Sequence, residues 1–214
     1  MANNSQDISN DNDALHSIYT VPNIITMVRL MLIPFAFTLL IQGSNDVLAF
    51  IIFALAGASD FVDGQIARRT NQVSELGKAL DPLVDRFLLA AGIIGLYVVG
   101  RVPLWILCVL IGRDFVLFCG VMRLKMLDAK IFPVIFLGKL TTALLLVGFS
   151  GLIVNLPKLH GLNIADATWL PGLNGQPVSI WIYFVYIGMI FSLITAGIYL
   201  YKGMKSAQVA KTKH

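Results

Sequence analysis

Four aspartates lie close together in the sequence, in or beside strongly apolar segments. They are Asp60, Asp63, Asp81 and Asp85. The first two are three positions apart and the last two are four apart, so each pair shares one face if its segment is a regular helix. An aspartate at the centre of a membrane-spanning helix costs about 2.5–3.5 kcal/mol on insertion scales. Because four carboxylates also repel one another, a compensating positive charge is expected among them.

The chemistry of this acidic cluster favours hard divalent cations. It offers carboxylate oxygens, and no cysteine or histidine lies nearby in the sequence, which suits Mg²⁺ or Mn²⁺. Two such cations, about 3.5–4 Å apart, would neutralise four carboxylates and would suit a displacement at phosphorus. A plainer interpretation is an interfacial charge cluster in which the acids pair with Arg68, Arg69 and Arg86. Acids this dense within apolar segments are more often functional.

The composition indicates what kind of element must carry these acids. Of the 214 residues, 57% are hydrophobic and 13% are charged, whereas an average soluble domain is about 45–50% apolar and about 25% charged. A soluble fold could not bury so much apolar surface. The composition therefore excludes a disordered chain, a nucleic-acid-binding module and an ordinary soluble enzyme. The net charge of +4 fits the lysines and arginines of cytoplasmic loops.

Six apolar segments are each long enough to cross about 30 Å of hydrocarbon. Backbone polar groups in a span must be satisfied within it, so these segments are predicted to be helices. Pro82 leaves open whether the third helix begins at Asp81 or begins near Ser74 and bends at the proline. The sequence thus predicts an all-α integral membrane protein with six transmembrane helices. The predicted parts are a polar N-terminal tail (1–20), a membrane domain (21–205) and a basic C-terminal tail (206–214), and the apolar segments cover about 24–41, 47–66, 80–99, 102–122, 133–156 and 178–201.

The distribution of lysine and arginine predicts the orientation in the membrane. Arg101 and Lys158 are the two cations in the loops on one side, whereas ten follow the second, fourth and sixth segments. Since such residues favour the cytoplasmic side, both termini of this multi-pass cell-membrane protein are predicted to be cytoplasmic. The acidic cluster then faces the cytoplasm. The ten cations are Arg68, Arg69, Lys78, Arg123, Lys125, Lys130, Lys202, Lys205, Lys211 and Lys213.

Small residues accompany the acids. Gly64 follows Asp63 directly, Ala67 precedes Arg68, and Gly77 lies four positions before Asp81. A face lined with small side chains lets a bulky, phosphate-bearing ligand approach the backbone, although such residues taken singly more often serve helix packing. The guanidinium of Arg68 would hold a phosphate that the cations already bind.

The fixed spacings resemble the signature of the CDP-alcohol phosphatidyltransferase family. The sequence matches that signature at all eight specified residues, reading Asp60-x2-Asp63-Gly64-x2-Ala67-Arg68-x8-Gly77-x3-Asp81-x3-Asp85. The resemblance extends to Pro22-Asn23-Ile24-Ile25-Thr26-x2-Arg29, Leu80-Asp81-Pro82-Leu83, Gly112-Arg113-Asp114 and Gly138-Lys139. It therefore covers nearly the whole chain beyond the polar tail.

The resemblance implies six transmembrane helices, a homodimer and two divalent cations, Mg²⁺ or Mn²⁺. The reaction that it implies moves a phosphatidyl group from CDP-diacylglycerol to an alcohol within the membrane and releases CMP, with no role for nucleic acid. Asp60, Asp63 and Asp81 would be metal ligands, and Asp85 would touch a metal and act as the general base. The donor would be bordered by Gly64, Ala67, Arg68, Gly77, Asn23 and Thr26.

The acceptor alcohol is open to two interpretations. The 22–26 start and the 80–82 run resemble the glycerol branch of the family, in which phosphatidylglycerophosphate synthases use glycerol 3-phosphate. Cardiolipin synthases of the eukaryotic and actinobacterial type use phosphatidylglycerol instead. Phosphatidylglycerophosphate synthases commonly have Arg-Glu in place of Arg113-Asp114, a second lysine at Thr141 and an arginine at Val121. A phosphomonoester with nearly two charges needs more cations than a phosphodiester, so these departures favour phosphatidylglycerol.

Four cations in or beside the fourth and fifth segments are predicted to receive the acceptor. A short loop can bring these two segments together on the cytoplasmic side, where their charges can converge on the metal site. Arg123 and Lys125 could restore a phosphate site, so glycerol 3-phosphate is kept as the alternative acceptor. The four predicted acceptor residues are Arg113, Arg123, Lys125 and Lys139.

A cation or proton transporter and a catalytically inactive scaffold are the alternatives from other functional classes. A transporter would spread its acids through the depth of the membrane, commonly with internal repeats. Here the acids concentrate on one side, and the sequence shows no repeat. A scaffold would have lost some of the acids, whereas all four are present. Both observations favour the enzyme.

Overall fold

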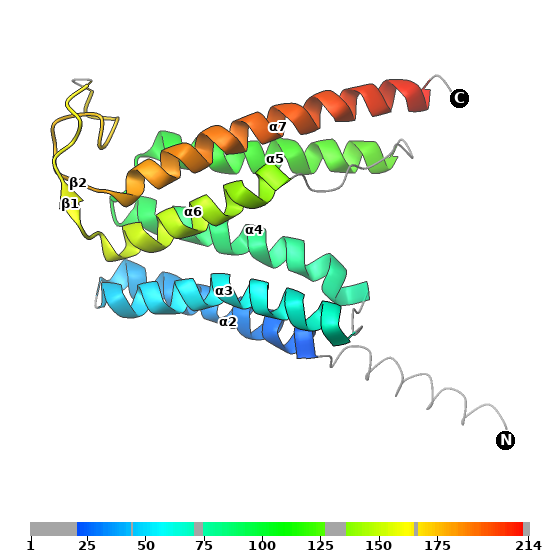
Figure 1. The fold of residues 1–214 in the computed structure, drawn as a ribbon, viewed down its shortest axis with the longest axis horizontal. Coiled ribbons are helices and arrows are strands. Elements are labelled where there is room, and N and C mark those ends of the chain that lie inside the picture. The colour runs from blue at the N-terminus through cyan, green and yellow to red at the C-terminus, as the bar shows by residue number, and fades with distance from the viewer. Residues whose placement is uncertain (1–20, 44, 71–74, 127–135, 165–166, 212–214) are drawn as a thin grey trace. The chain divides into compact units, whose positions relative to one another are not determined.

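Six helices account for most of the chain that the structure describes. The computed structural model describes residues 21–43, 45–70, 75–126, 136–164 and 167–211, without the side chains of 21–23, 60–70, 75–82, 125 and 209–211. Helices and one pair of very short strands follow each other along the chain (Figure 1). They are α2 (Val21–Gln42), α3 (Asp46–Thr70), α4 (Glu75–Val98), α5 (Leu104–Met126), α6 (Phe136–Val154), β1 (Lys158–Leu159), β2 (Val178–Ser179) and α7 (Trp181–Lys211).

The described helices have the lengths that a bilayer requires. The shortest, α6, has 19 residues, and a span needs about 17–25. In α3, the apolar stretch found among the described residues is shorter and covers Asp46–Ser59. The predicted all-helical membrane architecture is therefore confirmed, whereas six crossings and cytoplasmic termini stay predictions. Four stretches of the described chain are both long and apolar enough to cross: Ile24–Gln42, Leu104–Leu124, Phe136–Val154 and Trp181–Gln208.

Some boundaries differ from the predicted segments. Helix α4 begins at Glu75, so the earlier of its two predicted starts is correct and Pro82 lies inside the helix. Helix α7 continues to Lys211, beyond the predicted apolar segment, because its last ten residues are mostly good helix formers such as lysine, alanine and glutamine. The antiparallel pairing of β1 with β2 is absent from the prediction, since two residues are too few to show an alternating pattern.

Two units make up the chain, and the first (residues 1–92) contains the antiparallel pair α2 and α3. Gly43, with φ +62°, ends α2, and its N–H donates to the carbonyl of Leu39 at 3.2 Å. This is the usual role of a glycine at a helix C-terminus. The side-chain oxygen of Asn45 then accepts the N–H of Leu48 at 3.0 Å and caps the start of α3.

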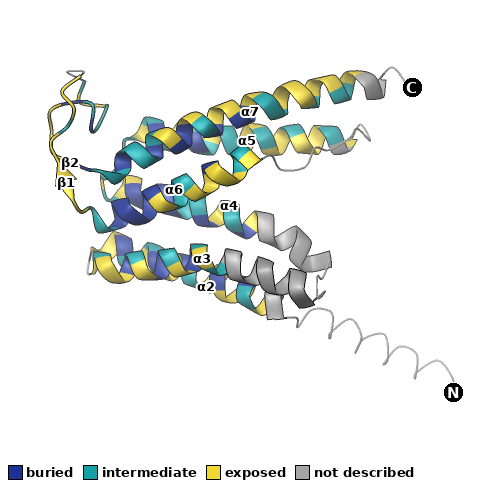
Figure 2. Cartoon of the chain, viewed as in Figure 1, coloured by how far each residue is buried: buried dark blue, intermediate teal, exposed yellow. Residues whose placement is uncertain are grey.

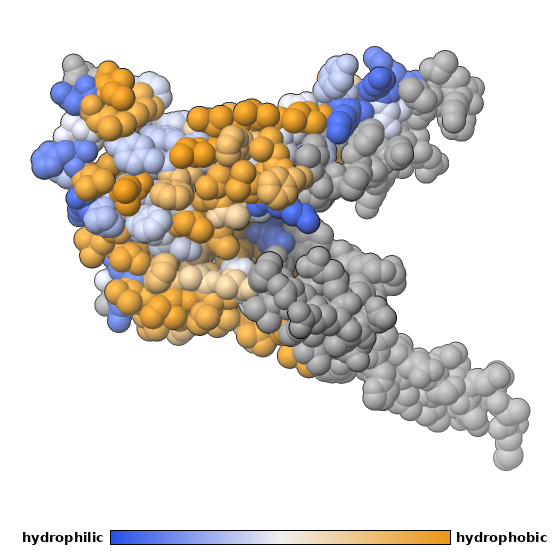
Figure 3. Space-filling view, viewed as in Figure 1, coloured by the Kyte–Doolittle hydropathy of each residue, from blue (hydrophilic) through white to orange (hydrophobic). Residues whose placement is uncertain are grey.

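The buried residues of α2 and α3 recur every three or four positions, as expected of packed helix faces. The other faces of these helices are exposed and apolar, with Met31 75% and Leu55 58% exposed. Figure 2 shows buried and exposed residues alternating around each helix, and Figure 3 shows apolar side chains over much of the visible surface. Such an exposed surface suits contact with lipid. The buried stripes include Ile33, Ala36 and Leu40 on α2 and Ala49, Phe53 and Ala56 on α3.

The second unit (residues 93–214) is built on close packing of α6 and α5 against α7. Glycines permit the approach of α6 to α7. A Cβ added at Gly151 would lie 2.1 Å from the ring of Trp181, and one added at Gly148 would lie 2.8 Å from Cγ2 of Val185. Such close approach is typical of small residues at helix crossings in membrane proteins.

One end of the second unit is closed by hydrogen bonds to backbone carbonyls. The indole N–H groups of Trp105 and Trp181 each donate to a carbonyl at 2.7 Å. The guanidinium of Arg101 donates to the carbonyls of Leu152 and Ile153, at the C-terminus of α6. Tryptophans at helix ends are typical of membrane–water interfaces.

Candidate active site

The four acids lie on two consecutive helices. Asp60 and Asp63 belong to the C-terminal half of α3, and Asp81 and Asp85 belong to the N-terminal half of α4. Both helices are continuous through these positions, so the predicted spacings of three and four residues are helical spacings. Residues 71–74 separate the two helices, and a chain spans at most about 3.3–3.6 Å per residue. The connection between the two acid-bearing halves is therefore short.

Most of the predicted motif lies where the backbone is described and the side chains are not. The metal and donor roles of these residues stay predictions. Among the side chains that the structure does describe, no three potential metal ligands gather. The predicted ligand whose side chain is described is Asp85. Outside the described side chains are Asn23, Asp60, Asp63, Gly64, Ala67, Arg68, Gly77, Asp81 and Lys125.

Asp85 is held by an arginine from another helix. Nη1 of Arg29, on α2, donates to Oδ1 of Asp85 at 3.2 Å. The Arg29 side chain is 0% exposed, whereas that of Asp85 is 40% exposed. A buried charge requires a partner of opposite sign, and this carboxylate supplies it. The ion pair therefore fixes Asp85 while leaving the carboxylate accessible to a substrate.

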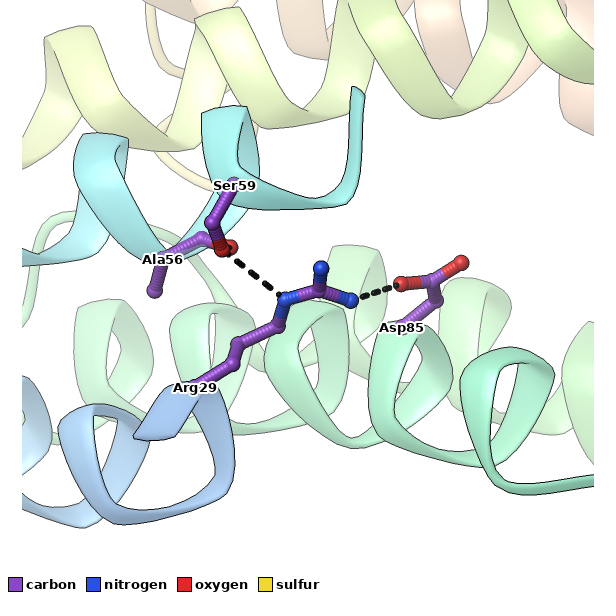
Figure 4. Close-up of polar contacts among 4 residues, drawn as sticks. All are labelled: Arg29, Ala56, Ser59 and Asp85. Carbon is purple, nitrogen blue, oxygen red and sulfur yellow. Dashed lines mark hydrogen bonds and ion pairs between the residues drawn. The ribbon is translucent and has the colours of Figure 1, made fainter. Parts of the chain in front are cut away.

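The guanidinium of Arg29 is also held by α3. Its Nε donates to Oγ of Ser59 at 3.1 Å, and the Ser59 hydroxyl donates to the carbonyl of Ala56 at 2.9 Å. Because a hydroxyl can accept and donate at the same time, this arrangement directs a lone pair of Ser59 towards Arg29. Helices α2, α3 and α4 thus meet at one guanidinium (Figure 4).

Thr26 is the predicted donor-binding residue whose side chain the structure describes. It lies three positions before Arg29 on α2 and is 3% exposed. Residues three apart on a helix share a face, so Thr26 belongs to the buried face that carries Arg29. Its contact with the donor stays a prediction.

No role was assigned from the sequence to Arg29 or Ser59. Arg29 carries one usable signal, because a cation within an apolar span is costly unless it is paired. Its partner could not be deduced from spacing, since Arg29 and Asp85 are 56 positions apart. For Ser59 the signal is weaker and consists of its place directly before Asp60.

The predicted acceptor residues lie on α5 and α6, in the second unit. Nη1 of Arg113 donates to Oδ1 of the adjacent Asp114 at 2.5 Å, and Nε of Arg113 has no partner among the described residues. Arg123 and Lys139 are exposed. The positive charge of Arg113 is thus partly neutralised by its neighbour. The convergence of these cations on Asp85, which belongs to the first unit, stays a prediction.

Comparison with known families decides the class of protein. The sequence model described as CDP-alcohol phosphatidyltransferase matches residues 19–194. The chain belongs to the CDP-alcohol phosphatidyltransferase family. The matched region contains the whole acidic motif, Arg29 and Ser59. The predicted enzyme class is therefore confirmed, and the transporter alternative is not favoured.

Relatives of this phosphatidyltransferase carry names that differ in the acceptor. A cardiolipin synthase (CMP-forming) from Streptomyces coelicolor is 32% identical over 194 residues, 85% of this chain and 87% of the relative. A CDP-diacylglycerol–glycerol-3-phosphate 3-phosphatidyltransferase from Bacillus subtilis is 30% identical over 183 residues, 78% of this chain and 94% of the relative. A probable phosphatidylglycerophosphate synthase from Mycobacterium tuberculosis is 33% identical over 153 residues, which are 69% of this chain and 71% of the relative. The predicted resemblance to the glycerol branch is confirmed.

Proposed function

We propose that this phosphatidyltransferase moves a phosphatidyl group from CDP-diacylglycerol to a glycerol-type acceptor and releases CMP. The observation that carries the proposal is the environment of Asp85: its carboxylate is paired with a buried arginine, and its side chain is still 40% exposed. A general base must be both oriented and within reach of the proton that it takes. The ion pair and the exposure of Asp85 support this role within the acidic motif of the family.

In the proposed step, the acceptor hydroxyl oxygen attacks the phosphorus that carries the diacylglycerol. A new phosphorus–oxygen bond forms while the bond from that phosphorus to the bridging oxygen of the pyrophosphate breaks. CMP leaves with the bridging oxygen, and the hydroxyl proton passes to the carboxylate of Asp85. Bonds and charges balance without a further reactant.

The donor set of the motif fits divalent cations. Its predicted ligands are carboxylates on the consecutive helices α3 and α4, which suit hard cations such as Mg²⁺ or Mn²⁺. When bound, the cations supply positive charge to the pyrophosphate and to the departing CMP. The small residues of the same helices and Arg68 would border the donor. The residues that would hold the cations are Asp60, Asp63, Asp81 and Asp85.

Phosphatidylglycerol is the acceptor that we favour. Arg113, in the predicted acceptor pocket, is engaged by Asp114 at 2.5 Å, which leaves less positive charge for a phosphomonoester carrying nearly two negative charges. The name of the Streptomyces coelicolor relative supports the same choice. Glycerol 3-phosphate is the second candidate, supported by the exposed side chains of Arg123 and Lys139 and by the name of the Bacillus subtilis relative.

The acceptor is tested with the purified protein in detergent, CDP-diacylglycerol and Mg²⁺. Phosphatidylglycerol and glycerol 3-phosphate are supplied separately, CMP release is measured and the lipid product is identified by mass. We expect CMP and cardiolipin with phosphatidylglycerol, and little product with glycerol 3-phosphate. Efficient conversion of glycerol 3-phosphate without cardiolipin formation would change the acceptor and leave the reaction class standing. An absence of CMP release with every glycerol-type acceptor would refute the proposed function.

The same proposal includes a homodimer in the cell membrane with its active site facing the cytoplasm. The lysine and arginine distribution supports the orientation, and the family resemblance supports the dimer. Cysteine labelling at the membrane surfaces, in a protein whose Cys108 and Cys119 are replaced by serine, checks the orientation. Arg69→Cys should react from the cytoplasmic side, and Lys158→Cys from the other side. Mass measurement of the protein in detergent checks the dimer.

A further inference from the structure

Arg29 is the one charged side chain that is fully buried among the side chains that the structure describes. Its guanidinium contacts two other helices, through Ser59 on α3 and Asp85 on α4. A cation inside an apolar span is costly. The placement therefore has to be explained by what the guanidinium does there.

We propose that Arg29 is a positioning residue for phosphatidyl transfer: anchored by Ser59, it fixes the Asp85 carboxylate in the rotamer that receives the acceptor proton. This inference rests on the proposed role of Asp85 as general base. Arg29 acts through Asp85 and not on the substrates, because its own side chain is 0% exposed.

The shape of the guanidinium explains how the anchoring works. The group is planar, and its N–H donors point in fixed directions. Once Nε is bound to Ser59 at 3.1 Å, the direction of Nη1 towards Asp85 is set as well. An exposed aspartate would otherwise move among several rotamers. A lysine ammonium at the same position would supply charge but could not transmit the direction set by Ser59.

Two other roles for Arg29 make different predictions. If Arg29 serves only to hold α2, α3 and α4 together, its loss lowers stability, and activity falls in proportion to the folded fraction. If Arg29 binds the donor directly, its loss raises the KM for CDP-diacylglycerol. A positioning residue instead lowers kcat, because the misplaced carboxylate affects the chemical step after both substrates have bound.

The test uses Arg29→Lys and Ser59→Ala in the full-length protein, with Ser192→Ala as the matched control. Ser192 is likewise a serine in a helix; it is buried, and its Oγ has no partner among the described residues. Four quantities are measured for each protein: kcat, the KM for CDP-diacylglycerol, Tm, and the increase in Tm that CMP produces in the presence of Mg²⁺. The last quantity reports nucleotide binding independently of turnover.

We expect Arg29→Lys to lower kcat on the order of 100-fold, since a displacement of about 1 Å can have that effect. Ser59→Ala should lower kcat several-fold, because the direct pair between Arg29 and Asp85 survives. The KM and the CMP-induced shift in Tm should match those of Ser192→Ala. The proposal is refuted by an unchanged kcat in Arg29→Lys, by a rise in KM alone, or by losses that follow Tm. A wild-type protein that releases no CMP would instead refute the proposed function.

Discussion

The two units of the molecule bury polar side chains in different ways. In the second unit, the buried hydroxyls of Thr141 and Thr195 donate to carbonyls four residues earlier in their own helices, at 2.9 and 2.7 Å. In the first unit, the buried guanidinium of Arg29 reaches across to α3 and α4. A bond back to the same helix satisfies a hydroxyl without selecting a neighbouring helix. The contacts of Arg29 do select neighbours.

This difference separates what each unit contributes. The second unit is held together by close packing, with glycines that allow α6 and α7 to approach each other. The first unit contains a buried charge beside the acidic motif. Apolar side chains in place of a buried ion pair often give equal or greater stability. Substitutions in the first unit should therefore affect turnover more than stability, and substitutions at the helix crossing of the second unit should do the reverse.

The largest expected effect comes from replacing a predicted metal ligand. Asp60→Asn, Asp63→Asn and Asp81→Asn should each reduce turnover on the order of 10⁴-fold at limiting Mg²⁺, because metal ions supply several kcal/mol of charge stabilisation and each 1.36 kcal/mol is a factor of ten. Titration of activity with Mg²⁺ checks this loss, and excess Mg²⁺ should restore part of the turnover. Near-normal turnover of any one variant at limiting Mg²⁺ would remove that residue from the ligand set.

Asp85→Asn should lower kcat about 10³-fold, within the usual contribution of a general base. The amide oxygen can still accept the bond from Nη1 of Arg29, but the buried guanidinium loses its counter-charge, so Tm should fall as well. The amide cannot take the acceptor proton. Binding of CDP-diacylglycerol, measured by equilibrium dialysis, should therefore persist while transfer stops. Loss of donor binding in this variant would show that Asp85 is a structural ligand and not the base.

The comparison of the two units also shows what the sequence could reveal. Helix positions were predictable because bilayer thickness fixes the length of an apolar span. The spacing of the acids was predictable because residues three or four apart on a helix share a face. Both inferences use short-range information. They place Asp60 and Asp63 in α3 and Asp81 and Asp85 in α4, where the structure has them.

Tertiary partners could not be predicted in the same way. Arg29 lies 56 residues before Asp85 and 30 before Ser59, and several acids of the motif were equally plausible partners for it. The pairing of Arg113 with its neighbour Asp114 was equally hidden, because adjacent residues on a helix point in different directions. In both cases the choice of partner depends on rotamers and on the packing of neighbouring helices.

In the second unit, Gly151→Ala should lower stability by about 1–3 kcal/mol, the usual cost of overpacking. The added Cβ would lie 2.1 Å from the ring of Trp181, so that ring must move. Gly197→Ala is the matched control, since nothing lies within 4 Å of a Cβ at that position on α7. Thermal unfolding in detergent measures the difference. A loss of kcat at low temperature without a lower Tm would contradict the separation between the two units.

Arg113→Ala tests the link between the second unit and the acceptor. If Arg113 binds the phosphate of glycerol 3-phosphate, its loss should raise the KM for that acceptor about tenfold, the low end for a hydrogen bond to a charged group, and should reduce the dependence on salt. The effect on phosphatidylglycerol should be smaller, because acyl chains supply part of its binding. Lys158→Ala, which removes an exposed cation of β1, is the control. Equal KM values for the variant and this control with both acceptors would exclude Arg113 from the pocket.

The smallest effect is expected from Arg101→Gln. Arg101 donates to the carbonyls of Leu152 and Ile153 at the C-terminus of α6, where a cation contributes about 0.3–1 kcal/mol. Glutamine keeps much of the side-chain length and removes the charge, so Tm should fall slightly while kcat and both KM values stay at the level of Lys158→Ala. Arg29 and Arg101 are both arginines whose guanidinium donates to a segment far along the chain. If Arg101→Gln reduced kcat as Arg29→Lys is expected to do, the contrast would reflect helix anchoring in general and not the orientation of Asp85.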